Sequence, residues 1–197
     1  MMIITRTVLR REETDSPPDW QEWVIDEAAA LPLLKHAYDR GLNTWDTADV
    51  YSNGRSEEII GKALKQYNIP RNKVVILSKC YFGVMDDGSQ PPIPAVSTND
   101  GAMVNQVGLS RKHILDAVDA SVKRLGTHID VLQIHRLDRD TPREEIMRAL
   151  NDVVESGKVR YIGASSVCFL LRIRLVKRRL TMAIDGRVGV SDFAKYC

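Results

Sequence analysis

Apolar residues along this chain follow two alternating patterns, one helical and one extended. Helical spacing, with apolar residues three or four positions apart, predicts helices over residues 26–41, 56–67, 110–126 and 141–157. Short continuous apolar runs lie between these segments and predict buried strands over residues 42–48, 74–79, 129–135 and 159–166. Helix and strand are therefore expected to alternate from residue 26 to residue 166.

Signals at the helix ends agree with this division. Three glycines follow the last periodic positions and predict where helices stop: Gly41, Gly126 and Gly157. Ser56 is expected to cap the second helix, with Glu57 in its first turn. Thr141 is expected to cap the fourth helix, with Glu144 completing a capping box.

Regular alternation of helix and buried strand predicts a parallel α/β sheet with right-handed crossovers. The pattern alone leaves a doubly wound sheet and a barrel both open. The chain has no G-x-G-x-x-G fingerprint of a Rossmann cofactor site. Its four histidines show no paired spacing on one helix, so no metal site is expected.

Polar residues stand where successive predicted strands end. They are Asp46 and Tyr51 after the first strand, Lys79 at the end of the second and His135 at the end of the third. Each alone has an ordinary explanation as a turn residue, a solvated strand end or a core imidazole. In a barrel of parallel strands, however, the carboxyl ends of the strands face one shared mouth, where active sites lie.

These four residue types can together protonate a carbonyl group. A phenol is a poor proton donor at neutral pH, but a neighbouring ammonium stabilises the phenolate. Lys79 is the natural partner for Tyr51, and Asp46 can hold the lysine charge if that lysine is buried. His135 can donate a hydrogen bond that orients a carbonyl oxygen.

Composition restricts the class of protein. The chain has 197 residues, of which 44% are hydrophobic and 27% charged, and no apolar run approaches the roughly 20 residues of a membrane helix. No secretory signal is recognisable, and the three scattered cysteines predict no disulfides, so a cytoplasmic location is expected. Basic residues concentrate in residues 167–197, and the remainder is slightly acidic, so nucleic acid is not an expected partner.

Four stretches resemble the aldo-keto reductase family, in particular its fungal and plant branch with aryl-alcohol dehydrogenase-like enzymes. They read GLNTWDTADVYSNGRSEEIIGKAL, ILSKCYFG, LQIHR and YIGASS. The resemblance implies a TIM (β/α)8 barrel, NADPH as cofactor, and reduction of aldehydes or ketones to alcohols. The expected small-molecule partner is a carbonyl substrate.

The resemblance also implies roles for particular residues. Tyr51 becomes the general acid, Lys79 its activating neighbour, Asp46 the partner of Lys79, and His135 the substrate-orienting group. Cofactor binding is implied for Asp46, Ser165 and Ser166, the two serines lying beside the nicotinamide amide. Trp45 and the loop from Cys80 to Leu109 are expected near the barrel mouth.

The chain also departs from the family pattern. Residues 1–19 do not show the family's first strand, and residues 167–197 do not show its last strand–helix units or its adenosine-phosphate motif. We therefore expect a single, incomplete barrel domain, matched over about residues 20–166, with a divergent tail and edges open to self-association. A catalytically inactive fragment and a non-enzymatic regulatory protein on the same scaffold are the alternatives, and NADPH is not distinguished from NADH.

Overall fold

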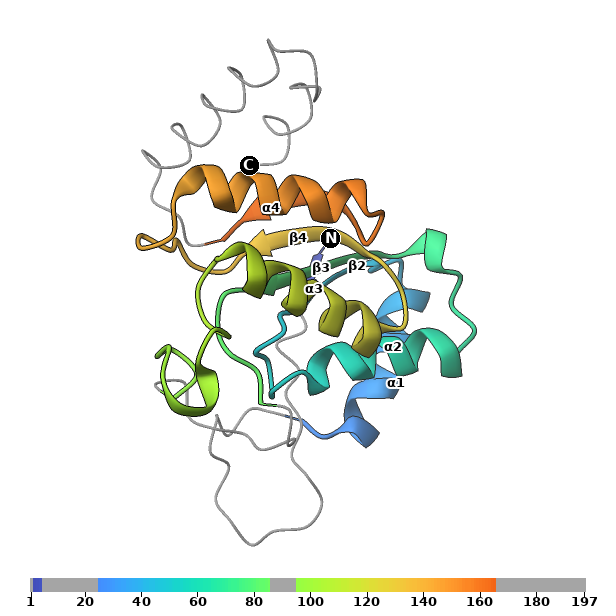
Figure 1. The fold of residues 1–197 in the computed structure, drawn as a ribbon. Helices are drawn as coiled ribbons and strands as arrows, with labels where there is room; N and C mark the ends of the chain where they lie inside the picture. Colours follow the sequence, from blue (N-terminus) through green and yellow to red (C-terminus); the bar gives the residue numbers. More distant parts are fainter. Residues whose placement is uncertain (1, 5–24, 86–94, 166–197) are drawn as a thin grey trace, which may run out of the picture.

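The computed structural model describes residues 2–4, 25–85 and 95–165. Ser166, the tail over residues 167–197, and two of the cysteines, Cys168 and Cys197, lie outside the described residues. Helices and strands alternate as the apolar pattern predicts (Figure 1). The elements are β1 (Met2–Ile4), α1 (Glu27–Asp39), β2 (Thr44–Asp46), α2 (Arg55–Gln66), η1 (Arg71–Lys73), β3 (Val75–Cys80), η2 (Gly101–Met103), α3 (Arg111–Leu125), β4 (Ile129–Ile134), α4 (Arg143–Glu155) and β5 (Val159–Ala164).

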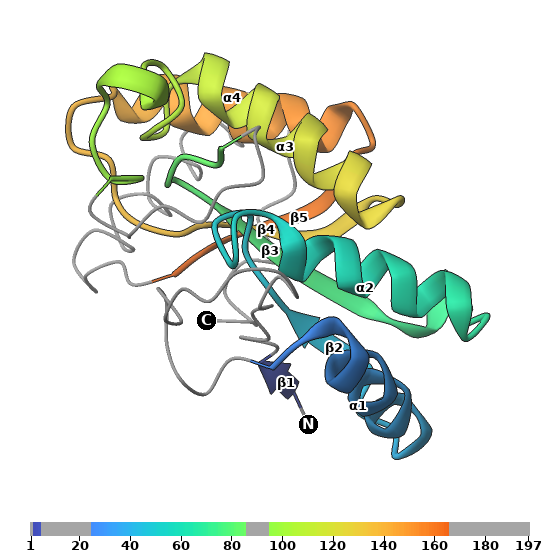
Figure 2. The same ribbon diagram turned by 90° about the horizontal axis from the view of Figure 1, so that it is seen from below.

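The five strands form one sheet in which every neighbouring pair is parallel. Their order in space, β1-β2-β3-β4-β5, is their order in the sequence. The helices α1 to α4 lie together on one side of the sheet (Figure 2). A doubly wound sheet reverses its strand order and carries helices on both faces, so the arrangement is that of part of a barrel.

The N-terminal strand corrects one expectation. We expected the first strand of the family to be missing, whereas Met2–Ile4 pairs with Thr44–Asp46 as β1. The physical reason is that β2 presents unpaired backbone groups at its edge, and a short apolar run can pair with them. Within the described residues, β1 and β5 each have a strand neighbour on one side only.

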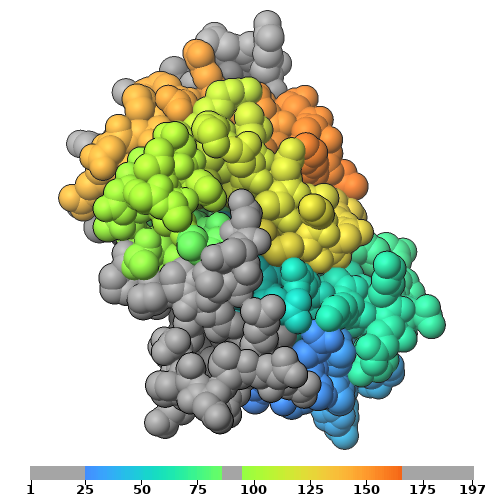
Figure 3. Space-filling model, turned by 60° about the horizontal axis from the view of Figure 1, so that its bottom comes forward, coloured from blue at the N-terminus to red at the C-terminus, as the bar shows by residue number. Residues whose placement is uncertain are grey.

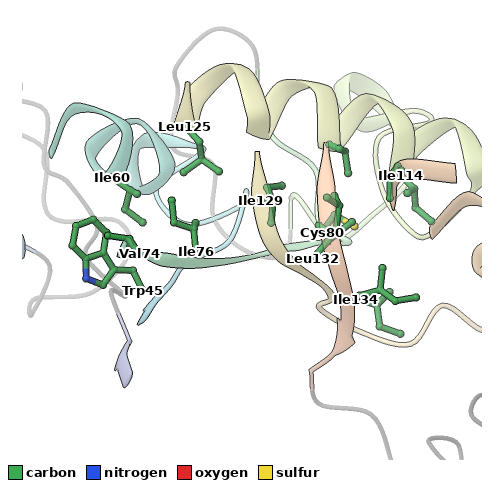
Figure 4. Packing of buried hydrophobic residues seen from close by; sticks show 14 of the residues in the cluster. Trp45, Ile60, Val74, Ile76, Cys80, Ile114, Leu125, Ile129, Leu132 and Ile134 are labelled. Carbon is green, nitrogen blue, oxygen red and sulfur yellow. The ribbon is translucent and has the colours of Figure 1, made fainter. Parts of the chain in front are cut away.

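The main core lies between the sheet and the helices (Figure 4). Trp45, Ile76 and Leu132 are almost fully buried in this core. The helices α2 and α3 approach closely at Gly61, where a Cβ atom would lie 2.7 Å from the Leu125 carbonyl oxygen. None of the described helices is both long enough and apolar enough to cross a bilayer.

Two predicted helix caps are wrong. The N-cap of α2 is Gly54, and Ser56 lies inside the helix, where its hydroxyl is 2.7 Å from that of Thr47. The N-cap of α4 is Pro142, because the Thr141 hydroxyl donates instead to Asp138 Oδ2 at 2.7 Å. Both hydroxyls are engaged by side chains outside the helix, that of Ser56 by Thr47 and that of Thr141 by Asp138. The three glycine stops are confirmed, since each has a positive φ at or next to the end of its helix.

Candidate active site

Backbone hydrogen bonds continue the parallel ladder past the carboxyl ends of the strands. The amide of Asp49 donates to the Lys79 carbonyl at 3.1 Å, that of His135 to the Cys80 carbonyl at 3.0 Å, and that of Ser165 to the Ile134 carbonyl at 2.9 Å. Residues following β2, β3, β4 and β5 are therefore held along one edge of the sheet. Active-site residues of parallel barrels come from this edge.

Lys79 is the buried charge of the site. Its residue is 5% exposed, and its Nζ donates to Asp46 Oδ2 at 2.6 Å and to the Thr47 carbonyl at 2.7 Å. Asp46 is itself only 7% exposed. An ammonium this deep requires a charged partner and further acceptors, and both come from the end of β2.

Gln133 is a member of the site that the sequence analysis missed. It pairs in register with Lys79, and its Nε2 donates to Asp46 Oδ1 at 3.3 Å. Gly163 on β5 leaves room for it, because a Cβ atom there would lie 3.0 Å from Gln133 Cγ. Strand periodicity contained the signal, since Gln133 lies two positions before His135 and shares its face of the sheet.

Tyr51 joins the other three predicted residues from the loop between β2 and α2. Its ring centroid lies 5.2 Å from Lys79 Nζ. The same ring contacts the His135 ring edge-on, with 5.8 Å between centroids and an interplanar angle of 81°. Tyr51 and His135 are both partly exposed, whereas Lys79 and Asp46 are buried behind them. Asp46, Tyr51, Lys79 and His135 are therefore brought together at one site.

The loop between β2 and α2, residues 47–54, carries Tyr51 and is called the tyrosine loop below. The sequence predicts the region from Cys80 to Leu109 near the barrel mouth, and the described part of this region packs against the tyrosine loop. Four buried apolar residues form a small second core: Ala48, Val50, Val96 and Met103. Tyr51 and Phe82 pack against this cluster, and the Phe82 ring stands edge-on to His135 at 5.1 Å. In Figure 3 residues 95–110 (light green) lie beside α3 on the surface. The described part of the loop thus forms one wall of the site.

Trp45 does not lie at the mouth, contrary to expectation. It is fully buried on the helix side of β2, near Ile60 and Val74 (Figure 4), and its Nε1 donates to the Leu42 carbonyl at 2.9 Å. Neighbouring residues on a strand point to opposite faces, so Asp46 and Trp45 cannot share one. The tryptophan belongs to the core.

The tyrosine loop has an unusual backbone. Ser52, Asn53 and Gly54 have positive φ values of 48°, 52° and 90°. Asn53 tolerates this conformation better than most residues, and its side chain exchanges two hydrogen bonds with the Met85 backbone, at 2.8 Å and 2.6 Å. The loop that carries Tyr51 is therefore tied to the segment that carries Phe82.

Two buried carboxyl groups lie on the opposite side of β3 from Lys79. Burial, together with the neighbouring Glu57 carboxylate, raises the pKa of Asp49 well above its ordinary value. Burial also raises the pKa of the Cys80 thiol well above its ordinary value, with Asp49 and Glu57 adding to the effect. A buried thiol with a raised pKa forms little of the reactive thiolate.

Ser165, for which a role beside the nicotinamide amide was expected, is among the described residues. It lies half-buried just after β5, and its amide donates to the carbonyl of Ile134, the residue before His135. A short hydroxyl side chain at a strand end can both donate to and accept from a carboxamide. Ser166, its expected companion, lies outside the described residues. Within those residues, no three His, Cys, Asp or Glu side chains are grouped so as to hold a metal ion.

Sequence comparison finds relatives among reductases. The model of the aldo/keto reductase family matches residues 17–184. Versiconal hemiacetal acetate reductase from Aspergillus parasiticus is 71% identical over 151 residues, covering 76% of this chain and 44% of the relative. An aldo-keto reductase from Alternaria alternata is 53% identical over 158 residues, covering 76% of this chain and 43% of the relative. The chain thus spans less than half the length of these relatives.

Comparison with solved structures also finds aldo-keto reductases. An aldo-keto reductase from Bacillus halodurans, in its holo form, superposes with a TM-score of 0.64 at 28% identity, covering 78% of this chain and 46% of that one. A thermostable aldo-keto reductase solved with the inhibitor epalrestat gives 0.61 at 29% identity, covering 77% and 46%. The family model covers most of the chain, and both structures share the arrangement of its sheet. The chain therefore belongs to the aldo/keto reductase family.

Proposed function

We propose that this chain carries the active site of an NADPH-dependent reductase that converts an aldehyde or ketone to an alcohol. One observation carries the proposal: the Lys79 ammonium is buried between the Asp46 carboxylate, 2.6 Å away, and the Tyr51 ring, whose centroid is 5.2 Å away. Burying an ammonium beside a partly exposed phenol costs free energy and is not required to stabilise the end of a sheet. General acid catalysis does require such an arrangement.

In this mechanism the Tyr51 hydroxyl donates its proton to the carbonyl oxygen of the substrate. Negative charge then develops on the phenol oxygen, and the nearby Lys79 ammonium stabilises it. Asp46 keeps Lys79 charged and fixed in place, and Gln133 in turn orients the Asp46 carboxylate. The burial of Lys79 and Asp46 strengthens this interaction, because little water screens it.

His135 orients the substrate. Its ring is held edge-on between Tyr51 and Phe82, at centroid distances of 5.8 Å and 5.1 Å. An imidazole in that position can donate a hydrogen bond to the same carbonyl oxygen that receives the proton. The aromatic surfaces on either side favour an apolar, flat substrate next to the reacting group.

When bound, NADPH supplies the hydride for this reaction. Ser165 would hold the carboxamide of its nicotinamide ring, and the family resemblance implies Ser166 and Asp46 as further cofactor-binding residues. Fluorescence titration of the 197-residue chain with NADPH and with NADH tests this assignment without requiring a substrate. The proposal expects saturable binding of NADPH. Equal affinity for NADPH and NADH would show that the chain does not recognise the additional phosphate of NADPH.

Steady-state oxidation of NADPH in the presence of a reactive aryl aldehyde tests the catalytic roles. Tyr51→Phe keeps the ring and removes the proton, so we expect kcat to fall by about 10²- to 10⁴-fold. Tyr67→Phe, at the far end of α2, is the matched control and should leave kcat unchanged. Undiminished turnover by Tyr51→Phe would refute the general-acid role. The compound named for the Aspergillus relative, versiconal hemiacetal acetate, is the first natural substrate to test.

A further inference from the structure

We propose that Arg124, on α3, is a positioning residue for Tyr51 that acts through Glu57 and Gly54. The inference rests on the catalytic role proposed above for Tyr51. Arg124 lies at the end of α3, on the helix side of the sheet, and its guanidinium donates to Glu57 and Ser121 rather than to the four residues of the site. It reaches both the helix that follows the tyrosine loop and the loop itself.

Glu57 is the first link. It is fully buried in the first turn of α2, three residues after Gly54. Its Oε2 accepts from Arg124 Nε at 2.7 Å, and its Oε1 accepts from the Ser78 hydroxyl at 2.5 Å. Ser78 precedes Lys79 on β3. One carboxylate thus joins the start of α2 both to α3 and to the strand that carries the catalytic lysine.

Gly54 is the second link. A Cβ atom at this position would lie 2.7 Å from Arg124 Cδ and 2.9 Å from its Nε. The arginine side chain therefore packs directly on the backbone at the end of the tyrosine loop. Gly54 has a φ of 90°, a conformation that a residue with a side chain rarely adopts, so the close approach and the turn require the same residue.

The ion pair with Glu57 and the packing on Gly54 hold the tyrosine loop from the helix side of the sheet. The Thr47 and Ser56 hydroxyls, 2.7 Å apart, already join the two ends of the loop. The Thr47 carbonyl also accepts from Lys79, so the loop and the lysine share one frame. Two buried carboxyl groups and one guanidinium meet on the helix side of this frame: Asp49, Glu57 and Arg124. Arg124 is the group that neutralises Glu57 there, so its loss releases the start of α2.

The expected consequence is a displaced Tyr51. A shift of the phenol by about 1 Å should leave the proposed cofactor contact of Ser165 unchanged, since Ser165 follows β5 and the tyrosine loop follows β2, with β3 and β4 between them in the sheet. Misplacement of a catalytic group by about 1 Å lowers the rate by about 10²-fold. Disrupting the link should therefore lower kcat by that factor while KM for NADPH changes by less than about two-fold.

The primary variant is the double substitution Glu57→Gln with Arg124→Met. It removes both charges together, so that no unpaired charge is left in the core, and glutamine can still accept from Ser78. Arg124→Lys is the conservative variant and should restore part of the rate. The matched control is Arg71→Met with Asp130→Asn, a half-buried ion pair at the amino ends of β3 and β4, far from the tyrosine loop. We expect this control to lose stability but to keep its kcat.

A second measurement does not depend on turnover. The edge-on contact between the Tyr51 and His135 rings gives cross-relaxation between their protons in the NMR spectrum of a chain labelled at tyrosine and histidine. The proposal expects this signal to weaken several-fold in the Glu57→Gln, Arg124→Met variant and to keep its wild-type intensity in the control. If both variants retain that intensity, or if both have the same kcat, Arg124 has no positioning role. If the wild-type chain shows the contact but no turnover, the proposed function fails, and the NMR comparison still decides the role of Arg124.

Discussion

Replacing Lys79 by methionine tests the energetics of the buried pair at the centre of the site. The Lys79 and Asp46 side chains are only 6% and 9% exposed. Methionine fills much of the same space but removes the ammonium group that pairs with the Asp46 carboxylate at 2.6 Å. Breaking a buried pair in this way costs about 3–5 kcal/mol, a large part of a typical stability of about 5–15 kcal/mol.

The double-mutant cycle with Asp46→Asn separates this interaction from simple loss of packing. Asp46→Asn alone leaves the Lys79 ammonium with the Thr47 carbonyl, whereas the double variant leaves no unpaired charge. We therefore expect the double variant to be more stable than Lys79→Met alone, with a coupling energy above about 1.5 kcal/mol.

Guanidinium chloride unfolding followed by far-ultraviolet circular dichroism gives the four free energies that the cycle needs. Lys35→Met is the control, because the exposed pair between Lys35 and Asp39 should change stability by less than about 0.5 kcal/mol. Additivity of the two substitutions within about 0.5 kcal/mol would refute the reasoning, since it would mean that the two groups do not interact.

Three further predictions concern groups around the site. Burial lowers the pKa of His113, so stability should fall as the pH drops below its unfolded value of about 6.5, and His113→Gln should flatten that fall in pH-dependent unfolding curves. Burial raises the pKa of Asp138, but hydrogen bonds from Thr141, Leu109 and Asp140 outweigh this effect and hold the pKa below its ordinary value. Asp138→Asn should therefore lower the free energy of unfolding by about 2 kcal/mol at pH 7, and by less as the pH falls through that lowered pKa. Urea unfolding at pH 7 and at pH 3 measures the difference. Cys80 is 1% exposed, and burial raises its pKa, so peptide mapping after brief treatment with a thiol reagent should find it unmodified until the chain unfolds.

Much of the fold follows from the apolar pattern because each element buries one continuous face. The helices α1 to α4 and the strands β2 to β5 lie where periodicity predicts them. The four site residues are also predictable, since parallel strands bring their carboxyl ends to one edge and each of these residues lies at or just past such an end. The pattern does not identify a strand as short as β1, because three residues carry no measurable periodicity.

The sequence context of a residue does not predict its hydrogen-bond partner when the fold brings a competing group close to it. Glu57 has the sequence context of a first-turn carboxylate that favours the helix N-terminus, yet it is fully buried against Ser78 and Arg124. Thr141 has the context of a helix cap, yet Asp138 takes its hydroxyl. The partners of Glu57 are distant in sequence, whereas Asp138 lies only three residues before Thr141 and competes with the helix N-terminus for its hydroxyl.

Hydride transfer from deuterated NADPH to an aldehyde tests the central claim most directly, because it requires the cofactor, the carbonyl and Tyr51 to meet at one site. The wild-type chain is incubated with NADPH carrying deuterium on the transferred position, and the alcohol is analysed by mass spectrometry. The account predicts one deuterium on the former carbonyl carbon for the wild-type chain, and a rate lower by about 10²-fold or more for Tyr51→Phe. Folded wild-type chain that binds NADPH but forms no deuterated alcohol would contradict it, as would equal rates for the two chains.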